Sequence, residues 1–243
     1  MIKAVFFDLD GTLVPMDEKK FIKLYIDSLF EEVKQFHIEK EIFTRALMKG
    51  LMAMINNDGF VSNENLFWEV FDNELGMKLR DKKDIFDKYY LNNFKCVKFA
   101  AGESPESKKI IEFCRVLGLK TILSTNPIFP KQAVITRMNF VGLNTNDFDY
   151  ITSYENSFFC KPNPKYFASL LKDLGLKPEE VLVFGNNKEE DCYCSAQAGI
   201  KSYLVDNRCL IIPDSVKDEQ FECIKINEVN DVIQREIERN KTI

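Results

Sequence analysis

Two aspartates stand one residue apart near the start of the chain, in the stretch VFFDLDGTL that covers residues 5–13. Asp8 and Asp10 follow directly on an apolar run, and Gly11 follows them as a turn residue. Carboxylates of like charge that are held so close repel each other unless a cation or a proton lies between them. The spacing therefore indicates chemistry that uses a metal ion or a shared proton.

Length and composition limit the classes of protein that can carry this pair. The 243 residues suit one large domain, or one domain with an insertion, and 45% hydrophobic with 29% charged residues is typical of a globular chain. A net charge of -5 and a pI near 5.2 argue against a nucleic acid or a membrane surface as partner, because both require a basic face. Seven cysteines and no recognisable signal peptide predict reduced thiols and a cytoplasmic location.

The elements that must position the two acids show two kinds of sequence pattern, one typical of a strand and one typical of helices. Residues 2–7 predict a buried parallel strand. From Asp17 to Phe94 apolar residues recur at helical spacing, with no convincing strand, which predicts a helical bundle inserted into another domain. The apolar positions of the four predicted helices lie within residues 21–36, 47–55, 66–71 and 85–90.

From Cys96 onward predicted strands and helices alternate. The strands are expected at 120–125, 148–153, 180–185 and 201–205, and the helices at 104–118, 130–140, from 163, at 189–198 and at 227–239. This alternation predicts an α/β fold with a doubly wound parallel sheet, in which ligands bind beyond the carboxyl ends of the strands. The residues expected at that edge are Asp8, Asp10, Thr125 and those after Gly185.

Four segments resemble, in order, the signature motifs of the haloacid dehalogenase-like hydrolase superfamily. They are DLDGTL at 8–13, Thr125-Asn126 in ILSTN, Lys161 in CKPNPKYF, and VFGNNKEEDCYCSAQAGIKSYLV at 183–205. The resemblance implies a Rossmann-type α/β core made of residues 1–14 and 97–243. It also implies a C1-type helical cap domain made of residues 15–96.

The resemblance also implies a role for each matching residue. Asp8 would attack phosphorus and become a transient aspartyl phosphate, while Asp10 would act as general acid and base. A Mg²⁺ ion would be held by the Asp8 carboxylate and the Asp10 backbone carbonyl. The Thr125 hydroxyl and the Asn126 backbone N–H would bind the phosphoryl oxygens, and Lys161 would neutralise the phosphoryl group and the nucleophile.

The fourth motif departs from the usual pattern of the family. Asn186 stands where the family usually has a metal-binding aspartate, Asn187 follows it, and Asp191 matches the second acid. The implied metal ligands are therefore Asp8, Asp10, Asn186 and Asp191, with one acid replaced by an amide that brings an oxygen but no charge. Acids at 189–191 also favour the start of a helix without any metal.

The function implied is a Mg²⁺-dependent phosphatase, a phosphoric monoester hydrolase, that acts on a small phosphorylated metabolite. Two alternatives remain open. A non-catalytic binding or regulatory protein on the same fold is favoured by Asn186. Dehalogenation is disfavoured because it has no need of an acid at the position of Asp10. The resemblance implies no particular substrate and no oligomeric state.

Overall fold

One parallel sheet of six strands, in the order β3-β2-β1-β4-β5-β6, forms the centre of the computed structural model, which describes residues 1–240. The strands are β1 (Ala4–Phe7), β2 (Lys120–Leu123), β3 (Tyr150–Ile151), β4 (Val181–Gly185), β5 (Lys201–Asp206) and β6 (Cys223–Lys225). The central strand β1 pairs with β2 on one side and with β4 on the other. The direction of winding changes between β1 and β4, which is where ligands bind in sheets of this kind.

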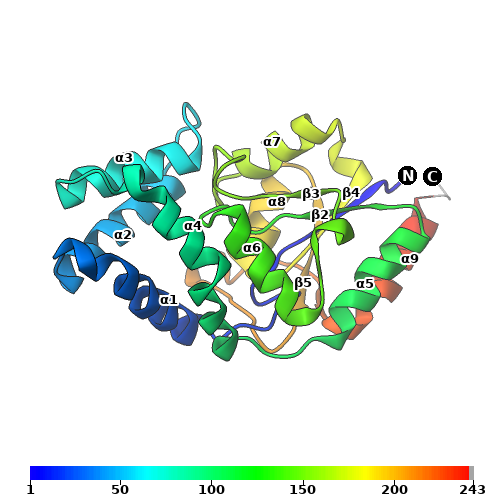
Figure 1. Ribbon diagram of the computed structural model, residues 1–243. Coiled ribbons are helices and arrows are strands. Elements are labelled where there is room, and N and C mark those ends of the chain that lie inside the picture. The colour runs from blue at the N-terminus through cyan, green and yellow to red at the C-terminus, as the bar shows by residue number, and fades with distance from the viewer. Residues whose placement is uncertain (241–243) are drawn as a thin grey trace.

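Helices cover both faces of this sheet, which explains why β1 is apolar along its whole length. Val5 and Phe7 belong to the hydrophobic cluster that includes α5 (Pro105–Val116) and α9 (Val229–Arg239). The alternate residues, Ala4 and Phe6, belong to the opposite cluster, which includes α7 (Lys165–Leu174) and α8 (Cys194–Gln197). Figure 1 shows α5 and α9 together on one side and α7 on the other. The predicted doubly wound α/β fold is confirmed.

Four helices lie between β1 and α5 in the chain. They are α1 (Glu18–Val33), α2 (Lys40–Ile55), α3 (Asn63–Leu75) and α4 (Lys83–Leu91). Figure 1 shows them gathered beside the sheet, at the left of the view, and we refer to them as the cap helices. The connections to and from them run next to each other, because Met16 forms an antiparallel bridge with Ala101. The predicted helical insertion is confirmed, whereas its predicted limits, 15–96, stay a prediction.

Aromatic side chains hold the cap helices together. Phe71 of α3 is fully buried and contacts the rings of Phe43 on α2, Trp68 on α3 and Phe86 on α4, with centroids 5.9–6.4 Å apart. Such pairs add to the free energy gained by burying the rings. Within residues 1–240, none of the helices combines the length and the apolar character that crossing a membrane requires.

Two elements differ from the sequence-based expectation. The strand β6 was not predicted, because it is a three-residue edge strand in which only Ile224 is buried and no alternating pattern can develop. The helix predicted at 189–198 begins as a π-helix, Lys188–Tyr193, before it continues as α8. A π-helical turn inside a helix is often found at functional sites.

We expect Phe71→Ala to lower the free energy of unfolding by about 3–5 kcal/mol, because it leaves a cavity among four aromatic rings, the fourth being that of Phe67. The control is Phe60→Ala, since Phe60 is 88% exposed on the loop between α2 and α3 and should change stability by less than about 0.5 kcal/mol. Urea denaturation of both variants measures the difference. A loss below about 1 kcal/mol for Phe71→Ala would show that the cap helices repack without this ring.

Candidate active site

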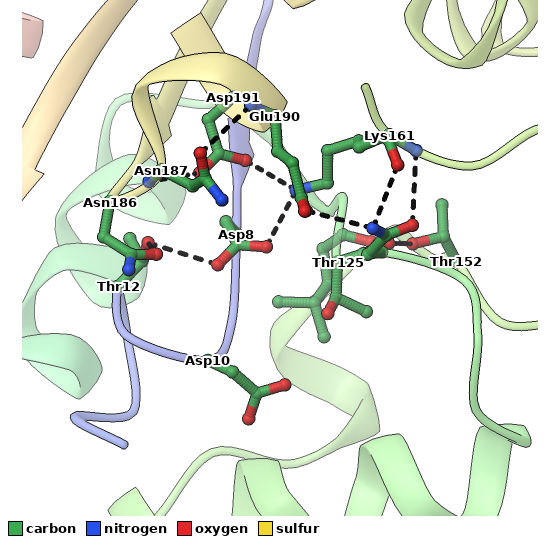
Figure 2. Close-up of polar contacts among 12 residues, drawn as sticks. Asp8, Asp10, Thr12, Thr125, Thr152, Lys161, Asn186, Asn187, Glu190 and Asp191 are labelled. Carbon is green, nitrogen blue, oxygen red and sulfur yellow. Dashed lines mark hydrogen bonds and ion pairs between the residues drawn. The ribbon is translucent and has the colours of Figure 1, made fainter. Parts of the chain in front are cut away.

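A buried lysine joins two carboxylates at the carboxyl edge of the sheet. Asp8 follows β1, Asp191 lies in the π-helix after β4, and Lys161 comes from the loop before α7. The Lys161 Nζ atom lies 2.8 Å from Asp8 Oδ1 and 2.5 Å from Asp191 Oδ1 (Figure 2). The Lys161 side chain is 1% exposed. Three segments far apart in sequence thus meet through one ammonium group.

The charge of Lys161 is stabilised by its neighbours. Burial by itself would lower the pKa of this amine, but the carboxylates of Asp191 and Asp8 outweigh burial and hold the pKa well above the usual 10.5. Lys161 is therefore a permanent cation at the site. It neutralises part of the negative charge of Asp8, and a second anionic group could approach Asp8 more closely as a result.

The second oxygen of Asp8 faces a different set of atoms. The Thr12 hydroxyl lies 3.2 Å from Asp8 Oδ2 and 3.0 Å from Asn186 Oδ1 (Figure 2). The amide of Asn186 is oriented because its Nδ2 donates to the Cys209 backbone carbonyl at 2.6 Å. The Asn186 oxygen therefore points toward the side of Asp8 that Lys161 leaves free.

These oxygen atoms could contribute to a cation site of low charge. Within residues 1–240, no group of three or more His, Cys, Asp and Glu side chains is arranged to hold a metal ion. A cation beside Asp8 Oδ2 would therefore depend on at most two carboxylates, the Asn186 amide oxygen, backbone carbonyls and water. Magnesium is commonly bound in this way, through one or two carboxylates and several waters.

Asp10 lies apart from this cluster, as Figure 2 shows, and lines the cavity described below. Its Oδ2 atom forms an ion pair with Nη1 of Arg137 on α6 (Lys131–Met138) at 3.2 Å. Its Oδ1 atom has no hydrogen-bond partner among the described residues. Enclosure raises the pKa of Asp10 to about 6, although Arg137 beside it acts in the opposite direction. A carboxyl group with this pKa can both give and take a proton near neutral pH.

Thr125 and Asn126 follow β2 and reach the site in different ways. The backbone carbonyl of Thr125 accepts hydrogen bonds from Thr152 Oγ1 at 2.7 Å and from the Tyr166 hydroxyl at 3.0 Å, which fixes this turn at the edge of the cavity. Asn126 Oδ1 accepts from the Lys161 backbone N–H at 3.2 Å. The Asn126 side chain therefore holds the loop that carries the lysine, a role that the sequence did not indicate.

Two residues of the fourth motif have structural roles: Asn187 caps the π-helix, and Asp191 forms an ion pair with Lys161. Asn187 caps the π-helix, because its Oδ1 accepts from the backbone N–H groups of Glu189 and Glu190. Asp191 Oδ2 accepts from the Asn187 backbone N–H at 3.0 Å, while Oδ1 pairs with Lys161. Both oxygens of Asp191 thus have protein partners, and its predicted role as a metal ligand stays a prediction.

Two glycines allow these side chains to come so close. A Cβ atom at Gly185 would lie 2.1 Å from Asp191 Cγ, so any larger residue there would displace this carboxylate. A Cβ atom at Gly11 would lie 2.2 Å from Asn186 Nδ2, and Gly11 also has a φ of +89°. Only glycine combines that backbone conformation with such a close approach. The site thus depends on both residues although neither has a side chain.

Two further residues of the site were missed in the sequence. Arg137 is 1% exposed, and its guanidinium lies 4.5 Å from the ring centroid of Phe129. Glu190 accepts from Asn126 Nδ2 at 3.0 Å, and burial raises its pKa to about 7. Glu190 could have been found from the acidic run of the fourth motif. Arg137 belongs to no motif and becomes visible only through its burial beside Asp10.

A cavity of about 280 Å³ lies between the carboxyl edge of the sheet and the cap helices. Its lining includes most of the predicted site residues, namely Asp8, Asp10, Thr125, Asn126, Asn186 and Asp191. Lys161 lies behind them, where it contacts Asp8 and Asp191. The structure therefore brings all the predicted catalytic, substrate-binding and metal-binding residues to one place.

The family of the chain follows from its sequence as a whole. A family model of haloacid dehalogenase-like hydrolases matches residues 2–199, and the chain belongs to this family. The predictions of the family and of a hydrolase are thereby confirmed.

Two glyceraldehyde 3-phosphate phosphatases are similar to this chain in sequence. The protein of Methanothermobacter thermautotrophicus is 26% identical over 208 residues, which cover 85% of this chain and 87% of that protein. The protein of Pyrococcus abyssi is 27% identical over 206 residues, which cover 83% of this chain and 80% of that protein.

Solved structures with the same fold include a phosphatase and a dehalogenase. The HAD phosphatase of Thermococcus onnurineus has a TM-score of 0.59 and 21% identity, with 96% of this chain and 98% of that chain covered. The 2-haloacid dehalogenase of Pseudomonas syringae pv. Tomato DC3000 has a TM-score of 0.64 and 16% identity, with 97% and 99% covered. At these identities the likeness establishes the α/β fold with its helical insertion.

We expect Arg137→Met to raise the pKa of Asp10 from about 6 to about 7 or higher, since the nearby positive charge that stabilises the carboxylate is lost. Arg137→Lys keeps the charge and should largely preserve the pKa. Arg115→Met is the matched control, because Arg115 pairs with Asp147 and not with Asp10. Carboxyl ¹³C NMR titration measures the pKa of Asp10 in each variant, and an unchanged value in Arg137→Met would mean that the ion pair has no electrostatic effect.

Proposed function

We propose that the chain is a phosphatase that removes phosphate from a small phosphorylated metabolite through an aspartyl-phosphate intermediate. One observation carries the proposal: a strand-end carboxylate, Asp8, is held by the buried cation Lys161 and faces the same cavity as a second acid, Asp10. Nucleophile, cation and acid-base group are the parts that phosphate transfer to a carboxylate requires. The phosphatase names of the sequence relatives support the same reaction class.

In the proposed mechanism an oxygen of Asp8 attacks phosphorus, and the bond between phosphorus and the alcohol oxygen breaks. Asp10 gives its proton to the departing oxygen, and its pKa of about 6 suits that exchange near neutral pH. Asp10 then takes a proton from water, which attacks the aspartyl phosphate, releases phosphate and restores Asp8. Lys161 and the Thr125 hydroxyl would stabilise the charge on the phosphoryl oxygens during both steps.

The charge of the site is the argument for Mg²⁺. Within residues 1–240 the cavity lining carries five carboxyl groups, and Arg137 and the adjacent Lys161 are the cations beside them. The acids are Asp8, Asp10, Glu18, Glu190 and Asp191. A phosphate dianion would be repelled by this surplus unless a divalent cation accompanied it. We propose that the Asp8 carboxylate, the Asp10 backbone carbonyl, Asn186 and Asp191 hold Mg²⁺, which when bound would neutralise charge between Asp8 and the phosphoryl oxygens.

Dehalogenation is the second candidate, because Lys161 neutralises Asp8 without a metal and Asn186 adds no charge. The presence of Asp10 favours phosphate transfer, since a halide leaves without a proton. Parallel assays separate the two reactions: phosphate release from p-nitrophenyl phosphate with and without Mg²⁺, and chloride release from 2-chloropropionate. Chloride release without phosphate release would establish the second candidate.

We expect Asp8→Asn to lower the rate of phosphate release at least about 1,000-fold, or more than about 4 kcal/mol of barrier, since an amide cannot replace the carboxylate nucleophile. Asp58→Asn is the control, because it makes the same change on an exposed loop outside the cavity lining. Circular dichroism of both variants verifies folding. A folded Asp8→Asn variant that retains a rate within about tenfold of wild type would refute the assignment of the nucleophile.

We expect Asn186→Asp to increase the stabilisation of the fold by Mg²⁺, because it adds a full negative charge next to the proposed ion. Without Mg²⁺ the variant should be less stable by about 1–3 kcal/mol, since the donor to the Cys209 carbonyl is replaced by an acceptor. For wild type, Mg²⁺ at about ten times its Kd should stabilise by about 1.4 kcal/mol and raise Tm by about 3–5 °C.

Asn187→Asp is the matched control for this experiment. Its side chain caps the π-helix through Oδ1, and an aspartate can accept the same two hydrogen bonds. The Mg²⁺-dependent shift in Tm should therefore stay close to that of wild type. Thermal unfolding over a Mg²⁺ titration compares the three proteins. An equal shift in Asn186→Asp and Asn187→Asp would place Asn186 outside the metal site.

A further inference from the structure

We infer that the alcohol part of the substrate is apolar, a hydrocarbon or aromatic group rather than a polyhydroxylated one. The inference rests on the proposed function and concerns the part of the cavity that the phosphoryl group does not occupy. The carboxylates and Arg137 that line the cavity lie at the carboxyl edge of the sheet and in the first turn of α1. The part formed by the cap helices would receive the alcohol.

The lining contributed by the cap helices is almost entirely apolar. Within the described residues, Glu18 at the start of α1 is its one charged side chain. The others are aliphatic or aromatic, as in Leu29, Leu47, Leu51, Trp68 and Phe86. Core residues of the same kind, Ile128 and Phe129, continue this wall. A hydrocarbon group that enters this space leaves water and gains apolar contacts. The polar atoms in this part of the lining, besides Glu18, are the tyrosine hydroxyls and the Trp68 Nε1 atom, which has no hydrogen-bond partner among the described residues.

Two of the three tyrosine hydroxyls of the lining have each other as partners, and the third belongs to Tyr154. The hydroxyl of Tyr25 on α1 lies 2.9 Å from that of Tyr90 on α4, so each is engaged by the other. The hydroxyl groups of a sugar or a triose would lose their hydrogen bonds to water here and find few replacements. Unpaired polar groups of this kind weaken binding strongly. Because the cavity lining offers few free hydrogen-bonding groups, it disfavours a polyhydroxylated alcohol.

Apolar side chains also reach the surface where they line the cavity. Ile22 is 50% exposed and Met48 is 42% exposed, although both belong to the lining. Exposed apolar residues that continue into an apolar cavity are typical of a binding site for an apolar group. A cavity of about 280 Å³ lies just below the usual range for small-ligand sites, roughly 300–1,000 Å³, so a short chain or one ring suits this volume.

A homologous series of phosphate esters tests the inference. We expect kcat/KM to rise about fourfold per methylene from ethyl to butyl to hexyl phosphate, because each buried methylene is worth about 0.8 kcal/mol. Glycerol 1-phosphate, which matches propyl phosphate in length but carries two hydroxyl groups, should be at least about tenfold poorer than propyl phosphate. A flat or falling series, or a preference for glycerol 1-phosphate, would overturn the inference and leave the phosphatase assignment in place.

Substitutions in the cap helices give the second arm. Met48→Glu places a charge in the lining and should reduce the ratio of kcat/KM for hexyl over ethyl phosphate at least about fivefold. Met52→Glu is the matched control, since Met52 lies one turn further along α2, is 49% exposed and is outside the lining. The ratio of kcat/KM for hexyl over ethyl phosphate in Met52→Glu should equal that of wild type. Equal losses in both variants would argue against an apolar binding site at this position.

Binding of alkylphosphonates separates this inference from the proposed function. Their carbon–phosphorus bond is not hydrolysed, so calorimetry with ethyl- and hexylphosphonate reports binding alone. Tighter binding of hexylphosphonate, by about tenfold or more, supports the apolar site even if no ester is hydrolysed, in which case only the phosphatase assignment fails. Equal binding of the two phosphonates refutes the apolar site whatever the rates.

Discussion

The ammonium group of Lys161, buried between Asp8 and Asp191, is the interaction on which the rest of the site depends. A lysine that is 1% exposed loses its hydration, and only well-placed opposite charges can compensate for that loss. Removing one partner would leave an uncompensated buried charge, which typically costs about 3–5 kcal/mol. The three segments that carry these residues are therefore constrained to fixed positions relative to one another.

Several ordinary features of the fold satisfy that constraint. Parallel pairing of β1 with β4 brings the residues after both strands to the same edge of the sheet. Gly185 leaves room for the Asp191 carboxylate, and the Asn187 backbone N–H holds its second oxygen. The Asn126 side chain binds the backbone of Lys161. Hydrogen bonds to backbone groups thus do the positioning, and the side chains of Asp8 and Lys161 remain available for chemistry.

Local sequence signals were enough to predict the strands β1 to β5, the cap helices and the edge at which Asp8 lies. Each of these depends on periodicity or on a motif within a few residues. The strand β6 and the π-helix were beyond such signals, because one is too short for a pattern and the other differs from an α-helix only in its backbone winding. Arg137 and the Asn126 side chain were missed for another reason. Their roles arise from contacts with Asp10 and Lys161, which are distant in sequence.

The apolar character of the cavity could not be predicted from the sequence for a third reason. Residues such as Leu47, Leu51 and Trp68 recur at the spacing of any amphipathic helix, and the sequence cannot distinguish a side chain that packs on a neighbour from one that lines a cavity. The chemistry of phosphate transfer is concentrated in short motifs of the core, whereas the selection of the alcohol is spread over four helices of the cap. Substitutions in the cap helices can therefore change the preferred alcohol while Asp8, Asp10 and Lys161 keep their positions. For the same reason, likeness in the core motifs identifies the reaction class much better than it identifies the substrate.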